Sequence, residues 1–217
     1  MSVVSRKLIL PALAMAVLLT GCGGSPNARY YTLQSSSQAI PAAPARIEYQ
    51  IEVAPVSVPE QADQPQLMLR DGPGEGELMP MYSDRWSAPL GNEIRSALAD
   101  TLTAKLGALD VNSLAPARDV PVWRVQANVQ RFDMIVGGPV RLDATWRVRP
   151  IKVSGAAPLL CRTVIELPAQ GNAVVGSLVE AQQQAVALLG QTIASAIESG
   201  GARALPASAD VRLLGCA

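Results

Sequence analysis

The chain has 217 residues, of which 49% are hydrophobic, and its 18 basic side chains are balanced by 18 acidic ones. This neutral balance gives no support for nucleic-acid binding, which needs a strongly basic surface. No histidine occurs, which excludes histidine-based catalytic triads, histidine-ligated zinc and histidine general bases.

The first 21 residues have the three-part pattern of a secretory signal. The basic pair Arg6-Lys7 precedes an apolar stretch, residues 8–18, which is shorter than the roughly 20 residues that a membrane-spanning helix needs. Leu19-Thr20-Gly21-Cys22 resembles a bacterial lipobox, where signal peptidase cuts before the cysteine and the cysteine is acylated. The alternatives are a transmembrane anchor or an ordinary signal with a chance cysteine. We therefore expect a mature lipoprotein that begins at Cys22.

Acylation of Cys22 also sets the expected location. Two or three acyl chains hold a protein on a membrane surface without spanning it, because each buried CH₂ contributes roughly 0.8 kcal/mol. Gly23 follows the cysteine, where an aspartate would resemble the signal for retention in the inner membrane. We therefore expect the inner leaflet of the outer membrane, with the folded domain facing the periplasm.

The hydropathy pattern then predicts a short strand, a linker, a half-buried strand and a hairpin. In chain order these are residues 30–33, 34–46, 47–53, and 67–69 with 78–81 flanking a glycine-rich loop at 71–76. The loop lacks the Gly-Lys-Ser/Thr ending of a phosphate-binding loop, so we interpret it as a hairpin loop. Glu48 and Glu52 share one strand face and could form an acid/base pair, but the alternation that places them there also exposes them.

Two amphipathic helices and three further strands follow. The first helix is expected from near Ser87, with Pro89 in its first turn and Gly107 as its stop. The strands are expected at 123–130, 140–149 and 159–167, with a bulge before Phe132, which falls out of phase. The second helix is predicted to start from a capping box formed by Ser177 and Glu180, and to end at Gly200-Gly201.

These elements predict an α+β fold, in which two amphipathic helices pack on the apolar face of an antiparallel sheet. The expected organisation is a signal peptide, a lipidated tether and linker containing the short first strand, an α+β domain and a C-terminal tail. Their respective bounds are 1–21, 22–46, 47–201 and 202–217.

Two remaining cysteines and several surface residues allow alternative interpretations. Cys161 and Cys216 are an even pair in an oxidising compartment, which favours a disulfide, although a buried Cys161 and a free Cys216 would fit as well.

Trp86, beside Tyr82, either packs under the first helix or anchors a protein contact, since Trp, Tyr and Arg dominate interface hot spots. Three arginines lie on the polar face of the predicted strand 140–149: Arg141, Arg147 and Arg149. They are either solvated or in contact with another subunit.

Taken in order, these features resemble the PqiC-type lipoproteins, the auxiliary lipoproteins of ABC-type transport systems. The resemblance covers most of residues 20–200. It rests on the lipobox, Arg29-Tyr30-Tyr31-Thr32-Leu33, Arg85-Trp86-Ser87-Ala88-Pro89-Leu90 with the helix body after it, Val125-Gln126-Ala127-Asn128-Val129-Gln130-Arg131-Phe132-Asp133 with the strand to Trp146, and the final amphipathic helix.

The resemblance implies a non-catalytic role with no cofactor or metal. Members resemble outer-membrane-anchored partners of MCE-domain proteins, which build periplasmic tunnels for lipid movement, work with an inner-membrane component and support membrane integrity. A homo-oligomeric ring that receives the end of the tunnel is implied. By this resemblance Cys22 carries the lipid, and the possible partner contacts are Tyr30, Tyr31, Trp86, Pro89 and Leu90.

Two other functions are compatible with the sequence. One is a lipoprotein that binds phospholipid or a small molecule itself, which requires an apolar cavity between the sheet and the helices. The other is a periplasmic hydrolase that uses Glu48 and Glu52.

Overall fold

The computed structural model describes residues 27–35, 49–72, 76–114, 119–170 and 174–217. The predicted signal peptide, Cys22 and most of the linker lie outside these residues. The described elements are β1 (Arg29–Tyr31), β2 (Gln50–Val53), β3 (Gln66–Arg70), β4 (Leu78–Trp86), α2 (Leu90–Leu106), β5 (Val122–Met134), β6 (Pro139–Ile151), β7 (Leu159–Pro168), α3 (Val174–Glu198) and β8 (Val211–Cys216).

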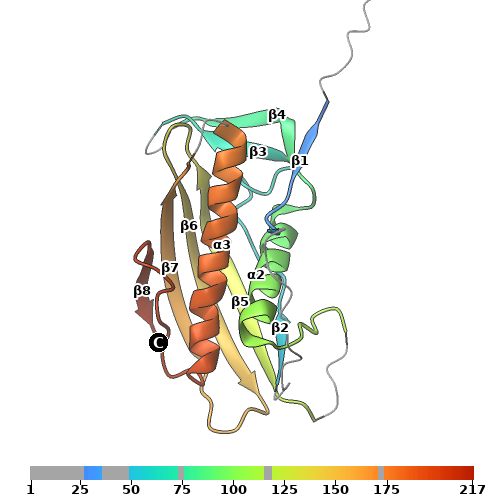
Figure 1. Ribbon diagram of the computed structural model, residues 1–217, viewed down its shortest axis with the longest axis vertical. Helices are drawn as coiled ribbons and strands as arrows, with labels where there is room; N and C mark the ends of the chain where they lie inside the picture. The colour runs from blue at the N-terminus through green and yellow to red at the C-terminus, as the bar shows by residue number, and fades with distance from the viewer. Residues whose placement is uncertain (1–26, 36–48, 73–75, 115–118, 171–173) are drawn as a thin grey trace, which may run out of the picture.

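A five-stranded sheet with the order β2-β5-β6-β7-β8 forms the body of the molecule. Strands β5 to β8 pair antiparallel, and β2 adds to β5 in parallel. Both helices cover one face of this sheet, and the opposite face is left open (Figure 1). The predicted α+β fold is confirmed.

The core lies between this sheet and the helices. Alternating inward side chains of the strands meet the apolar faces of α2 and α3, as the predicted periodicities require. Among the fully or almost fully buried residues are Val125, Leu142, Trp146, Val148, Ile165, Ile94, Leu98, Leu189 and Ile193. Each such side chain contributes roughly 1.5–3 kcal/mol relative to an exposed one.

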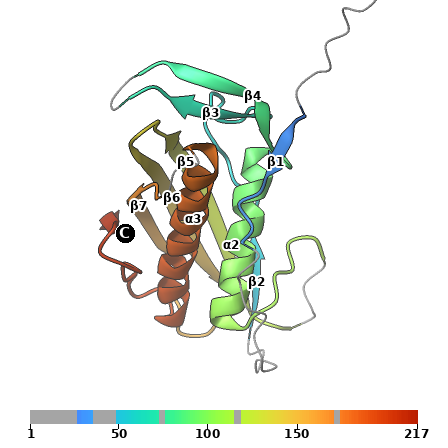
Figure 2. The same ribbon diagram turned by 45° about the horizontal axis from the view of Figure 1, so that its top comes forward.

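The remaining strands form a second sheet rather than joining the first. Its order is β1-β4-β3, and it crosses one end of the helices (Figure 2). The predicted hairpin is β3–β4, but β4 continues to Trp86, where β1 pairs with it in parallel. The pairing of β3 with β4 jumps between Gln66 and Leu67, and a bridge between Arg70 and Ile135 connects the two sheets.

The helix ends only partly follow the sequence signals. The prediction that Ser177 and Glu180 cap the second helix is wrong, because α3 already begins at Val174 and Ser177 is buried inside it. Burial of Val175 shows why: the apolar face continues one turn further toward the N-terminus. The predicted ends are confirmed, since Gly107 and Gly200 both adopt left-handed backbone conformations, each with φ 67°.

Two features of the large sheet concern register. The bulge expected before Phe132 is confirmed as a register shift between Val129 and Arg131, which returns Phe132 to the inner face. Strand β8 was not expected at all. It pairs with β7 across another register shift, so its apolar residues do not alternate regularly along the sequence.

The helices approach each other closely at Gly190 of α3. A Cβ atom at this position would lie 2.7 Å from Thr101 Cγ2 of α2. We expect Gly190→Leu to lower the free energy of unfolding in urea by about 1–3 kcal/mol, because the added side chain overpacks this contact. The matched control is Gln191→Leu at the neighbouring exposed position. Equal stability of the two variants would contradict the close contact.

Candidate functional site

The chain just after β1 is held against α2 by the buried carboxylate of Glu93, which is 4% exposed. Its Oε2 atom accepts hydrogen bonds from Thr32 Oγ1 at 2.7 Å and from the backbone N–H of Leu33 at 2.9 Å. Its Oε1 atom accepts a bond from Ser87 Oγ at 2.6 Å. Glu93 lies in the first turn of α2, where the helix dipole favours a negative charge. The carboxylate therefore joins the N-terminal strand, β4 and α2.

A second buried carboxylate, Asp84 of β4, holds β1 itself. Asp84 is 1% exposed and is reached by Arg29, whose Nε lies 2.8 Å from Oδ1 and whose Nη2 donates to Oδ2 at 2.9 Å. Burial raises the pKa of Tyr31, and hydrogen bonding to Asp84 raises it further. Gln183 of α3 donates to the backbone carbonyl of Thr32 at 2.8 Å. Residues 29–33, which we call the N-terminal clamp segment, are thus fixed to β4 and both helices.

The five possible contact residues have different environments. Tyr30 and Pro89 are exposed and Tyr31 is half-buried, so these three can reach a partner. Trp86 and Leu90 are buried in the core, so little of either side chain lies on the surface. Trp86 packs edge-to-face on Phe132, with ring centroids 6.0 Å apart. It anchors the start of α2, which is one of the two interpretations that the sequence allows.

The open face of the large sheet is rich in arginine. Arg162 forms a bidentate pair with Asp143, with its Nε and Nη2 atoms at 3.0 and 2.8 Å from the two carboxylate oxygens, and Arg141 lies 3.4 Å from Glu166. Arg147 and Arg149 are both exposed on β6, and neither has an ion-pair partner within the described part of the chain.

Strand register adds a further positive charge beside these two residues. Arg149 lies directly opposite Arg124 of β5, a like-charge pairing that is unfavourable in an isolated sheet. Arg124 is compensated by Glu52, whose Oε2 accepts a hydrogen bond from its Nε at 2.9 Å. Among the described residues, this part of the face therefore keeps two exposed guanidinium groups, those of Arg147 and Arg149, without a carboxylate partner.

The described residues give little support for a catalytic carboxylate pair or for a metal site. Glu52 is engaged by Arg124, and Glu48 lies outside the described residues. No group of histidine, cysteine or carboxylate side chains in the described ranges is arranged to hold a metal ion. An open hollow of about 360 Å³ lies where the β5–β6 turn and the end of β7 meet the first turns of α3, and its lining includes Gly137, Pro168 and Leu178. Neither described helix is long and apolar enough to cross a membrane.

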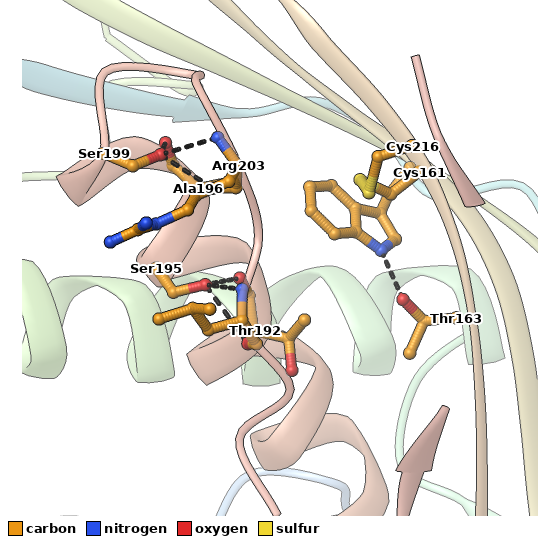
Figure 3. The surroundings of a disulfide bond; sticks show 10 residues. Cys161, Thr163, Thr192, Ser195, Ala196, Ser199, Arg203 and Cys216 are labelled. Carbon is orange, nitrogen blue, oxygen red and sulfur yellow. Dashed lines mark hydrogen bonds between the residues drawn. A yellow bond between two sulfur atoms is a disulfide. The ribbon is translucent and has the colours of Figure 1, made fainter. Parts of the chain in front are cut away.

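Cys161 and Cys216 are bonded to each other in the structure, with an Sγ–Sγ distance of 2.00 Å, and so join β7 to β8 (Figure 3). Trp146 of β6 lies directly opposite Cys161 in the strand register, and its indole Nε1 donates to Thr163 Oγ1 at 2.8 Å. The segment that returns from α3 to β8 is held by helix hydroxyls. Ser195 Oγ accepts from the Leu205 N–H at 2.8 Å and Ser199 Oγ from the Arg203 N–H at 3.2 Å.

The comparison with protein families decides what kind of molecule this is. The model for the ABC-type transport auxiliary lipoprotein component matches residues 31–194. The chain belongs to this family. The resemblance expected from the sequence is therefore confirmed, and the protein is an auxiliary lipoprotein of a transport system, from a family that is not a known enzyme family.

Solved structures agree on the fold of this lipoprotein. An uncharacterized protein is 18% identical with a TM-score of 0.61, over 79% of this chain and 99% of that one. A protein from Xanthomonas campestris is 17% identical with a TM-score of 0.51, over 81% and 94%. The PelC dodecamer from Paraburkholderia phytofirmans, at 11% identity and a TM-score of 0.32 over 75% and 91%, is too distant to support an inference. No curated protein matches the chain.

The residues that fix the clamp segment were missed by the sequence reasoning. Glu93 lies six positions after Ser87, a spacing that belongs to no helix-capping pattern. Asp84 is a charged residue in a strand, which sequence alone places on the surface. Only the tertiary fold brings Arg29 and Thr32 to these two carboxylates.

Glu93→Ala removes the acceptor for three hydrogen bonds of the lipoprotein. We expect it to lower the free energy of unfolding by about 1.5–3 kcal/mol and to speed hydrogen exchange at the Leu33 amide, because bonds to charged groups contribute that much. Glu93→Gln keeps one acceptor oxygen and is expected to have a smaller effect. Lys105→Ala in the last turn of the same helix is the control. Unchanged exchange at Leu33 would contradict the clamp.

The disulfide predicts a chemical protection pattern. In the unreduced protein we expect neither Cys161 nor Cys216 to react with an alkylating reagent, and both to react after reduction, as mass spectrometry would show. Because the bond closes a loop between residues 55 positions apart, Cys161→Ala/Cys216→Ala should cost about 2–4 kcal/mol of stability. Labelling of both thiols without reduction would refute the bond.

Proposed function

We propose that the protein is anchored to the outer membrane through acylated Cys22, faces the periplasm, and serves as a non-catalytic auxiliary subunit of an MCE/ABC-type lipid-transport system. In this role it docks the periplasmic tunnel protein and supports membrane integrity. Family membership supports the transport role. The observation that carries the proposal is the N-terminal clamp segment, because it fixes the chain to the domain only seven positions after the proposed anchor Cys22.

The open sheet face supplies the docking surface in this proposal. Arginine is enriched at interfaces, where its planar guanidinium pairs with carboxylates in bidentate geometry. Arg147 and Arg149 have no carboxylate partner within the described residues. A carboxylate of the docking protein could therefore form an ion pair with either of them without breaking one that already exists. Exposed Leu160 lies directly across from Arg147 and adds an apolar contact beside the charges. A ring of copies of this chain would present several such faces to one tunnel.

Affinity capture of the lipidated protein from membranes solubilised in mild detergent tests this function. Mass spectrometry should identify an MCE-domain protein or an ABC-type permease among the recovered proteins. We expect Arg147→Glu/Arg149→Glu to reduce recovery of that partner about tenfold, equal to about 1.4 kcal/mol of binding free energy.

The matched control carries the same charge change elsewhere. Arg203→Glu/Lys105→Glu alters two exposed residues that lie outside the sheet face, and recovery should stay unchanged. Equal loss in both double variants would show a general charge effect rather than a docking surface. Recovery of phospholipid without any transport protein would overturn the adaptor function.

A further inference from the structure

The point at which the chain enters the folded domain is close to the proposed anchor. Six residues, 23–28, separate Cys22 from Arg29, which is the first residue of β1. Even a fully extended chain spans at most about 3.6 Å per residue, so the Cα atoms of these two residues are no more than roughly 25 Å apart. Since Arg29 is fixed to the domain by Asp84, the same limit restricts how far this point of the domain can lie from the acylated cysteine.

The entry point lies at one end of the molecule. The clamp segment meets Gln183 in the N-terminal half of α3, and β1 begins at the end of the molecule that carries β3 and β4 (Figure 1). Helix α3 has 25 residues and is therefore about 37 Å long. An inverted domain would hold Arg29 about one helix length from the membrane, which exceeds the reach of the tether. The tether therefore excludes an orientation in which the three-stranded sheet points away from the membrane.

Two exposed tyrosines lie on this sheet. Tyr30 of β1 is 66% exposed and Tyr82 of β4 is 75% exposed. Arg29 pairs with Asp84 in a parallel register, and Tyr82 lies on β4 two positions before Asp84, close to the start of β1. Tyrosine has an apolar ring and a polar tip, and it is enriched where proteins meet lipid headgroups.

The charges at this end do not favour anionic lipid. Asp71 and Glu77 are exposed near the hairpin loop, and Glu60 and Asp63 are exposed in the connection before β3. Arg29 is already paired with Asp84, and Arg85, opposite Tyr30 on β4, is half-buried. Apart from Arg29, the exposed charges named here are acidic, which does not favour an acidic membrane, and the tyrosine rings are the groups suited to a neutral headgroup layer.

We propose that Tyr30 and Tyr82 form a seat on the lipid surface, which holds the domain upright with its three-stranded sheet against the headgroups. This inference rests on the proposed acylation of Cys22. The occupant of the surface is the bilayer itself, with zwitterionic headgroups. The seat directs the C-terminal end of α3, and Arg147 and Arg149 of β6, away from the membrane.

Site-directed spin labelling of the full-length acylated protein in vesicles of phosphatidylethanolamine and phosphatidylcholine tests the seat. The three native cysteines are acylated or disulfide-bonded under the proposal, so an introduced cysteine is the single free thiol. A label at Tyr82→Cys should be shielded several-fold from a water-soluble nickel quencher. A label at Leu205→Cys, beside Ser195 in the C-terminal part of α3, should be fully accessible.

A third label reports on the tyrosines as a pair. At Glu77→Cys the label should become more accessible to the quencher when Tyr30→Ser and Tyr82→Ser are introduced together, and should change little with the corresponding Phe variants. The mass of the N-terminal peptide reports acylation independently. An unacylated Cys22 would remove the anchor and with it the proposed function. With Cys22 acylated, equal accessibility at positions 82 and 205 would overturn the seat alone, as would shielding of position 82 that required a partner protein.

Discussion

Two buried carboxylates determine how this molecule is joined to what precedes it in the chain. Burying a carboxylate is costly unless donors surround it, and Asp84 and Glu93 obtain those donors from the N-terminal segment and its surroundings. The strand β1 has only three residues and could not persist through its own backbone pairing. The free energy that keeps it in place comes from satisfying these two charges and from burying Leu33. A short, isolated strand thereby becomes a rigid part of the domain.

The same requirement organises the two sheets. Asp84 lies in β4 and Glu93 in α2, with the buried Trp86 between them. Because β4 leads directly into α2, any displacement of the small sheet would pull both carboxylates from their donors. The small sheet is therefore fixed relative to the helices at the same place where the N-terminal segment attaches.

Periodic burial made most of the fold predictable from sequence. The apolar faces of both helices and the inward rows of β5, β6 and β7 follow directly from alternation, and glycines marked the helix ends. The start of α3 was missed because Ser177 resembled a cap while Val175 continued the buried face. Strand β8 was missed because its bulge disrupts the alternation. The site was less predictable, since Glu93 binds Thr32 and Leu33, which are 61 and 60 positions distant in sequence, and Asp84 binds Arg29, 55 positions distant.

The direction of β1 has a mechanical consequence. It lies parallel to β4, and β4 continues straight into α2. A force applied at the N-terminal end of β1 acts along the strand while α2 holds the far end of β4, so the strands are loaded in shear. Hydrogen bonds under shear share the load, whereas bonds that are peeled apart break one after another. The hydrogen bonds from Thr32 and Leu33 to the Glu93 carboxylate lie just after β1 and must break as well before the segment can be pulled out. The attachment therefore resists tension better than a strand of three residues would alone.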